Sequence, residues 1–463
     1  MINRLSNMLI FVMIVANLGV EEGGIYSLAL AFFFIGSRIA FWGLDQLLTR
    51  EVAKDHSKTG QYLSNFLYAR VILALLAIAI FYLIVQLSHY DSETKLVISL
   101  MLLSILPENI NNLCWGGFAA FEEYHLTGIG TVLNMGIKLG LGFIFIRMGM
   151  PLAYVALAVL LGHIGSMLVN LFITRRRYLM EGWQRADPQF IWRQLRYAIP
   201  FLFIGIFFIF DSRLDVILLS ALSSETAVGL YGAATAVIMA FTILPEGYRI
   251  AVLPVMSRFQ EDKSSRLRDL YERSFKYLLI IAIPISIAII LLAEDLISLI
   301  YRKDLPEAVS ALRVLAIGLT FTFLIVVNNR LLIVHNRQDL IARILILSTA
   351  ANVLVNVLLI PNYGAVGAAV ARTTSLLLLL FLTSWASSRL ITGVRKFRFV
   401  WRPLISSVVM GLVIWQLSSL GFWIQSAAGA VVYLSLLLLM GAFSAQELRI
   451  LRQLANTLRP GSS

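Results

Sequence analysis

The sequence predicts an all-α polytopic membrane protein with about fourteen transmembrane helices, and both composition and pattern indicate this fold class. Hydrophobic residues make up 59% of the 463-residue chain, and charged residues only 14%, against roughly 25% in a soluble domain. Because one crossing of a bilayer uses about 20 apolar residues, a dozen or more crossings would use about 240 to 300 residues. That leaves room for connections but not for a large water-soluble domain. The apolar runs are continuous and do not alternate, which indicates helices rather than a barrel.

Apolar runs between polar residues define the expected helices in order along the chain. The first six run from Leu5 to Leu18, Ile25 to Leu48, Tyr68 to Leu87, Leu96 to Phe121, Leu126 to Ile146 and Pro151 to Thr174. The next eight run from Ala198 to Leu222, Ala227 to Ile250, Phe275 to Leu292, Ala308 to Val334, Leu340 to Ile360, Ala365 to Leu390, Pro403 to Leu420 and Trp423 to Phe443. The first helix is short for a full crossing, and Val15-Ala16-Asn17 is a poor cleavage site for a signal peptide. We therefore expect it to be a truncated membrane helix.

An internal repeat predicts two lobes. Gly24-Ile25-Tyr26 is echoed by Gly229-Leu230-Tyr231, and Leu126 to Val155 can be laid on Leu340 to Ala369 without gaps. The predicted division is an N-terminal lobe at 1–174, a basic interfacial linker helix at 175–197, a C-terminal lobe at 198–390, and two further helices with a basic tail at 391–463. Each lobe has six helices, so both copies enter the membrane from the same side. Two pseudo-symmetric lobes around a central cleft are typical of an alternating-access transporter.

The net charge of +12 is mostly explained by orientation. If the N-terminus is cytoplasmic, the connections on that side hold most of the basic residues, whereas the opposite side holds little beyond Lys95, Arg147, Arg302 and Lys303. The cytoplasmic set is Arg50, Lys54, Lys58, Arg175, Arg176, Arg177, Arg185, Arg193, Arg196, Arg258, Lys263, Arg266, Arg268, Arg273, Lys276, Arg337, Arg343, Arg389, Arg395, Lys396, Arg398, Arg402, Arg449, Arg452 and Arg459. This asymmetry predicts that both termini are cytoplasmic, and it removes the reason to expect a nucleic-acid partner.

Enzymatic signatures are not found in the sequence. Cys114 is the single cysteine, so one chain cannot form a disulfide framework or a thiolate metal cluster. The five histidines are scattered without metal-ligand spacing, and there is no P-loop or dinucleotide fingerprint. We therefore expect neither a cofactor nor catalytic residues.

Polar residues within the apolar segments are the candidate functional residues, since charges at membrane depth are costly and usually face the protein interior. The predicted cationic cavity comprises Arg38, Lys138, Arg213, Arg249 and Arg372. The predicted polar lining comprises Asn134, Ser348 and Asn352, because the repeat register places the last two opposite Asn134 and Lys138. The candidates for coupling to a proton or sodium gradient are Asp45, Asp211 and Asp215.

Spacing groups these residues further. Arg38 and Asp45 are expected on one face of a single helix, and Asp211 and Asp215 on one face with Arg213 turned away. Structural alternatives stay open: buried pairs such as Glu246 with Arg249, an ion pair of Arg213 and Asp215, or arginines that snorkel to the interface. A cleft rich in cations would suit an anionic group such as a phosphate or pyrophosphate.

Several stretches resemble bacterial polysaccharide transporters of the O-antigen flippase family. They are Gly19 to Leu30 followed by Gly43 to Ala53, Asp211-Ser212-Arg213-Leu214-Asp215, Val228-Gly229-Leu230-Tyr231, and Leu359-Ile360-Pro361-Asn362-Tyr363-Gly364-Ala365-Val366-Gly367-Ala368-Ala369. The family belongs to the multidrug/oligosaccharidyl-lipid/polysaccharide exporter superfamily. Where relatives often have an arginine near the end of helix 1, this chain has Asn17.

The resemblance implies a non-enzymatic flippase of the bacterial cytoplasmic (inner) membrane. Its cargo would be an undecaprenyl-pyrophosphate-linked oligosaccharide, moved from the cytoplasmic to the periplasmic leaflet, and it could associate with other polysaccharide-assembly membrane proteins. The alternatives are a drug or cation antiporter of the same superfamily, a peptidoglycan-precursor flippase, and a membrane polymerase or glycosyltransferase. The short external connections count against the enzymes, and the surplus of buried bases counts against the antiporter.

Overall fold

The computed structural model describes residues 2–179, 183–258, 265–391 and 399–442, and every element of regular secondary structure in these ranges is helical. The basic residues Lys263, Arg395, Lys396 and Arg398 and the predicted tail at 444–463 lie outside the described residues. The chain forms two compact units. The first contains residues 1–236, 300–303 and 356–368, and the second contains 237–299, 304–355 and 369–463.

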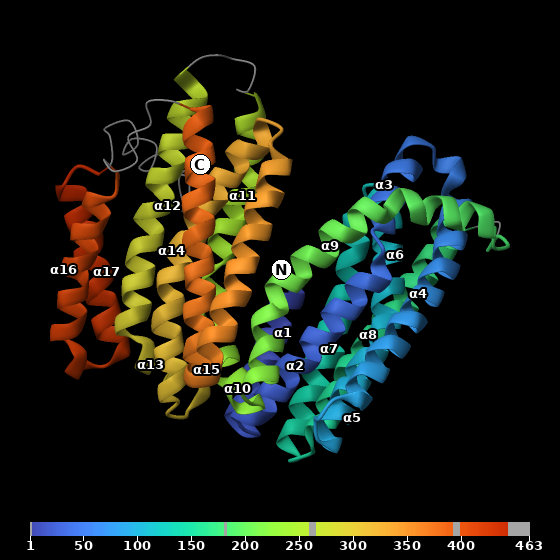
Figure 1. Cartoon of the computed structure of the whole chain (residues 1–463), viewed down its shortest axis with the longest axis horizontal. Coiled ribbons are helices and arrows are strands. Elements are labelled where there is room, and N and C mark those ends of the chain that lie inside the picture. The colour runs from blue at the N-terminus through green and yellow to red at the C-terminus, as the bar shows by residue number, and fades with distance from the viewer. Residues whose placement is uncertain (1, 180–182, 259–264, 392–398, 443–463) are drawn as a thin grey trace, which may run out of the picture. The chain divides into compact units, whose positions relative to one another are not determined.

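The first unit is a bundle of long helices (Figure 1). In chain order its helices are α1 (Ile2–Asn17), α2 (Val20–Phe41), α3 (Leu44–Lys54), the short 3-10 helix η1 (His56–Lys58), α4 (Thr59–Leu87), α5 (Ser92–Leu103), α6 (Ile105–Ala120), α7 (Tyr124–Arg147), α8 (Leu152–Tyr178), α9 (Pro188–Leu222) and most of α10 (Glu225–Phe241). Helix α6 packs between α4 and α8, and α2 packs against α4, α5 and α9.

The second unit contains the remaining helices. They are α11 (Ile243–Arg258), α12 (Ser265–Leu291), α13 (Ala293–Tyr301), α14 (Pro306–Val334), α15 (Gln338–Leu390), α16 (Trp401–Gln416), the 3-10 helix η3 (Ser418–Leu420) and α17 (Phe422–Leu439). Helix α12 packs against α14 and α16, and α16 packs against α17 (Figure 1). Two short stretches belong to the first unit instead. They are residues 300–303, at the end of α13 and in the connection after it, and residues 356–368, within α15.

The predicted fold class is confirmed, because each of the fourteen predicted segments falls largely on a described helix or a consecutive pair of helices, although the last ends at Phe443, outside the described residues. Within the described residues, ten helical stretches are long and apolar enough to cross a membrane, and some of them join consecutive helices, such as α5 with α6. One of these is α15, which contains two predicted segments joined at a kink, where Gly364 has φ 49° and ψ −126°. The predicted lobe boundaries rest on the repeat rather than on contacts, so the division into lobes stays a prediction.

Three predicted helices are each divided in two. Breaks fall at Trp42–Gly43, at Ser104 and at Thr242. At the first break both residues are left-handed, with φ 49° for Trp42 and 71° for Gly43, and the indole Nε1 of Trp42 donates to the carbonyl oxygen of Leu195 at 3.1 Å. Two left-handed residues in a row cannot continue a right-handed helix, so the helix ends here. Hydropathy does not reveal this break, because it depends on the side chains and not on the backbone conformation.

The predicted linker helix continues into the next predicted span. The side chain of Asp187 accepts hydrogen bonds from the backbone N–H groups of Gln189 and Phe190 at 3.0 and 3.1 Å, and Pro188 occupies the first helical position. Aspartate as N-cap followed by proline is a strong helix start. Helix α9 therefore begins at Pro188 and runs to Leu222 without the expected junction near Ala198.

The repeated glycine motif marks a close crossing of α2 and α10. A methyl group at Gly24 would lie 1.8 Å from the carbonyl oxygen of Glu225, and one at Gly229 would lie 1.9 Å from that of Val20. The crossing is reciprocal, because each glycine lies against the backbone of the opposite helix. Only glycine permits this approach.

Candidate functional site

Arg38 and Arg213 both lie along the contact between α2 and α9 in the first unit. The guanidinium of Arg38 lies over the ring of Phe41 at 4.8 Å, and that of Arg213 lies over the ring of Phe34 at 4.5 Å. The two rings are seven residues apart, which puts them on one face of α2. The structure therefore brings two of the predicted cavity cations to the same helix contact.

Arg38 has no carboxylate partner among the described residues. Its side chain is half-buried and lies against Gly205 of α9, where a methyl group would be 2.5 Å from Nε. The absent side chain at Gly205 is thus what lets the guanidinium lie across α9. A half-buried cation without a counter-ion is an energetically open site for an anion.

The expected placement of Arg38 and Asp45 on one helix is wrong. The break at Trp42–Gly43 puts Arg38 on α2 and Asp45 on α3. Asp45 instead forms an ion pair with Arg70 of α4, whose side chain is fully buried and also donates to the carbonyl oxygen of Asn109 at 2.6 Å. Arg70 was not a candidate on sequence grounds, because it lies two residues after Tyr68, the start of the third predicted segment, where a basic residue at the membrane edge is ordinary.

Lys138 lies in the interior of the first unit, which also holds other buried or half-buried polar groups. Its Nζ donates to Oδ1 of Asn7 on α1 at 2.7 Å, and only 2% of the residue is exposed. One turn earlier on α7, Nδ2 of Asn134 lies 3.1 Å from Nδ1 of His163, and the same ring nitrogen lies 3.0 Å from Oε2 of Glu108. These polar contacts come from four helices, α1, α6, α7 and α8, and include one base, one acid and one histidine. His163 had no sequence signal, because its partners come from other helices.

Asp215 is a buried carboxylate held by neutral donors. The hydroxyl of Tyr231 donates to its Oδ2 at 3.0 Å, and Nδ2 of Asn356 donates to its Oδ1 at 2.9 Å. Asp211, one turn earlier on α9, is only half-buried. The two predicted coupling residues on this helix thus lie in different surroundings.

The remaining predicted residues lie in the second unit. Nε of Arg249 donates to Oε2 of Glu246 at 2.6 Å within α11, which is the local pair that the sequence left open as an alternative. Ser348 is buried and bonds to the carbonyl oxygen of Ser375 at 2.8 Å, Asn352 is fully buried, and Arg372 is half-buried. Ser348 and Asn352 share the deep burial of Asn134 and Lys138, their partners in the repeat register.

The roles assigned to these residues stay predictions, but their placement separates them into three groups. Arg38 and Arg213 share the α2–α9 contact, Asn134 and Lys138 belong to the interior of the first unit, and Arg249, Arg372, Ser348 and Asn352 belong to the second unit. Among the described residues, no group of three or more His, Cys, Asp or Glu is arranged to hold a metal ion.

A profile of the polysaccharide biosynthesis protein family matches residues 1–260, more than half of the chain. The chain belongs to this family. The family predicted from the sequence is thereby confirmed, and a second profile, MatE, matches residues 200–358. The polysaccharide biosynthesis match includes both Arg38 and Arg213.

Two curated relatives are flippases by name. The chain is 26% identical over 211 residues to the probable flippase AglR of Haloferax volcanii, which covers 44% of each protein. It is 24% identical over 167 residues to the probable low-salt glycan biosynthesis flippase Agl15 of the same organism, which covers 36% of this chain and 35% of that one. These matches span less than half the length of either relative.

Solved structures with the same fold cover almost the whole chain. The lipid II flippase MurJ in an inward closed conformation superposes with a TM-score of 0.78 at 16% identity, over 95% of this chain and 96% of that one. An inward-facing MATE family multidrug resistance transporter superposes with a TM-score of 0.68 at 15% identity, over 84% and 95%. The likeness shows that the chain shares the fold of these two proteins.

Proposed function

We propose that this chain is a flippase that moves an oligosaccharide linked to undecaprenyl pyrophosphate from the cytoplasmic to the periplasmic leaflet of the bacterial inner membrane. Family membership and the flippases among its relatives support glycan-lipid transport. The main support for an anionic substrate comes from Arg38, because its guanidinium is half-buried and has no carboxylate partner in the described part of the chain.

The chemistry of Arg38 and Arg213 fits a pyrophosphate. A guanidinium presents a planar fork of N–H donors that pairs with two phosphate oxygens at once, and such pairs strengthen where water is scarce. Both guanidinium groups also lie over phenylalanine rings of α2, which hold their planes in place. We propose that they hold the lipid pyrophosphate while the sugars pass the polar interior, so that no covalent step is required.

Coupling to a proton or sodium gradient would use a carboxylate that can change its charge. Asp215 fits this role better than Asp45. Neutral donors surround Asp215, whereas Asp45 is paired with the buried cation Arg70. Neutralising Asp45 would leave that cation buried and unpaired, which is costly.

The test is transport of a fluorescent undecaprenyl-pyrophosphate glycan in proteoliposomes that contain the purified chain. Arg38→Ala should lower the initial rate at least tenfold, and Arg38→Lys should recover only part of it because it keeps the charge but loses the fork. Arg147→Ala is the matched control. Arg147 also lies over a ring, that of Phe143, at 5.3 Å, but it is exposed at the end of α7. Full transport by Arg38→Ala and Arg213→Ala together would overturn the proposal.

A further inference from the structure

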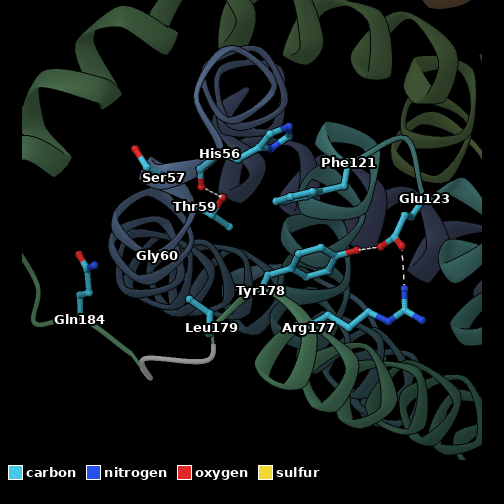
Figure 2. Close-up of a pocket in the computed structure, with 10 residues that line it drawn as sticks. All are labelled: His56, Ser57, Thr59, Gly60, Phe121, Glu123, Arg177, Tyr178, Leu179 and Gln184. Carbon is cyan, nitrogen blue, oxygen red and sulfur yellow. Dashed lines mark hydrogen bonds and ion pairs between the residues drawn. The ribbon is translucent and has the colours of Figure 1, made fainter.

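A pocket of about 590 Å³ opens on the first unit, and neither Arg38 nor Arg213 is among the residues that line it. It is lined by η1 and the start of α4, the turn between α6 and α7, the end of α8 with Leu179, and Gln184 (Figure 2). This volume lies within the roughly 300–1,000 Å³ typical of small-molecule sites. The basic residues Lys58, Arg175 and Arg176 lie nearby in the chain, so the positive-inside prediction puts the pocket on the cytoplasmic side.

One wall of the pocket is aromatic. The ring of His56 stacks on that of Phe121 with centroids 4.4 Å apart, and Phe121 in turn packs against Tyr178 at 4.6 Å (Figure 2). His56 is exposed, and Phe121 is its only ring neighbour among the described residues. The wall therefore presents aromatic surface to the pocket.

Glu123 is a fixed hydrogen-bond acceptor beside this wall. Its Oε1 accepts from Nη1 of Arg177 at 2.7 Å, and its Oε2 accepts from the hydroxyl of Tyr178 (Figure 2). A carboxylate has about four lone-pair positions, so two remain for a ligand. Arg177 and Tyr178 thus orient the carboxylate without using up its capacity.

Gln184 lines the pocket away from Glu123 (Figure 2). Its side-chain amide makes no hydrogen bond to a described residue, and Nε2 lies 3.0 Å from the position that a methyl group on Gly60 would take. The amide offers two donors and one acceptor. Because Gly60 has no side chain, the amide of Gln184 can lie close to its backbone.

The charges on the pocket wall decide which ligand fits. Arg177 and Glu123 neutralise each other, and His56 is the remaining titratable lining group besides Tyr178. An anion gains little here, because the one arginine already has its carboxylate. A sugar ring carries C–H groups that suit the negative face of an aromatic ring, and hydroxyls that suit a carboxylate and an amide.

We propose that this pocket binds a saccharide unit on the cytoplasmic side of the first unit. The proposal rests on the proposed function in one respect: the saccharide would belong to the lipid-linked glycan, and the pocket would capture it before the pyrophosphate reaches Arg38. The pocket would then affect the initial binding of the glycan rather than its passage across the membrane.

The test uses the full chain in lipid nanodiscs and a labelled oligosaccharide repeat unit, released by mild acid from the surface polysaccharide of the host. Fluorescence polarisation should show saturable binding that weakens at least tenfold in Gln184→Ala and in Glu123→Gln. Gln184→Ala removes an exposed side chain and should leave folding unaffected. Glu122→Gln makes the same charge change at the exposed neighbouring position and should bind like the wild type.

Transport separates this inference from the proposed function. In proteoliposomes, Gln184→Ala should raise the substrate concentration for half-maximal transport and leave the maximal rate unchanged. Equal glycan binding by the wild type and both pocket variants, or no binding at all, overturns the inference even if Arg38→Ala still abolishes transport. Weakened binding in the pocket variants combined with full transport by Arg38→Ala and Arg213→Ala together overturns the proposed function instead. Loss of a co-purifying protein without any change in glycan binding would make the pocket a protein-docking site and would also overturn the inference.

Discussion

Replacing Gly24 or Gly229 with alanine should destabilise the first unit through a backbone clash. A methyl group at Gly24 would lie 1.8 Å from the carbonyl oxygen of Glu225, whereas ordinary contacts begin near 3.4 Å. Helices α2 and α10 would have to separate locally by about 1.6 Å. Because the obstacle is backbone, no rotamer change relieves it. Overpacking of this kind costs roughly 1–3 kcal/mol, and a backbone obstacle puts the expected loss at the upper end.

Thermal unfolding of the purified chain, followed by loss of monodisperse protein on size-exclusion chromatography, measures this effect. Gly24→Ala and Gly229→Ala should each lower the apparent melting temperature by several degrees. The double variant should cost less than the sum of the two, because one separation of the helices accommodates both methyl groups.

Gly136→Ala is the control on the same kind of helix. Gly136 is exposed on α7 and has open space where the methyl group would go. There, alanine should be neutral or stabilising by up to about 1 kcal/mol through helix propensity. If Gly24→Ala and Gly136→Ala had the same apparent melting temperature, the close crossing of α2 and α10 would be refuted.

Three further predictions concern side chains of the first unit. Gly205→Ala should lower transport with little change in melting temperature, because its methyl group displaces the Arg38 guanidinium; unchanged transport would contradict this. Asp45→Ala should destabilise the chain by about 3–5 kcal/mol by leaving Arg70 buried and unpaired, and adding Arg70→Met should restore much of the loss in thermal melts. Asp91 caps α5, and hydrogen bonds from a hydroxyl and from backbone N–H groups in the first turn of α5 lower its pKa. Its ionised form therefore stabilises the fold above about pH 4, and Asp91→Ala should cost about 1 kcal/mol at neutral pH, with the difference in melting temperature narrowing as pH falls below that value.

The positions of the helices could be predicted from the sequence because hydropathy is a local property. Fourteen apolar runs were enough to place every described span, and the glycine–tyrosine repeat was visible without a structure. The structure adds the reason for that repeat: Gly24 and Gly229 meet at one crossing, so each copy of the predicted repeat supplies one glycine.

The pairings of the polar residues could not be predicted in the same way. Spacing put Asp45 beside Arg38, but a left-handed pair of residues breaks the helix between them, and the partner of Asp45 comes from α4. The sequence around His163 contains no neighbour at metal-ligand spacing. Its Nδ1 nevertheless lies within 3.1 Å of polar atoms of Asn134 and Glu108, which belong to two other helices. Such partners are chosen by packing between helices, and no window along one helix contains them.

The pairing of buried charges bears on which rival transport function we expect. Asp45 is paired with an arginine, Glu108 lies against a histidine, and Asp215 accepts hydrogen bonds from two neutral side chains. Arg38, in contrast, has no carboxylate in the described part of the first unit. A carrier of cations would need the opposite arrangement, with a buried acid left open and the bases satisfied. Arg38 is thus a half-buried guanidinium without a carboxylate partner, and we expect the ligand that completes its site to carry negative charge, as a lipid pyrophosphate does.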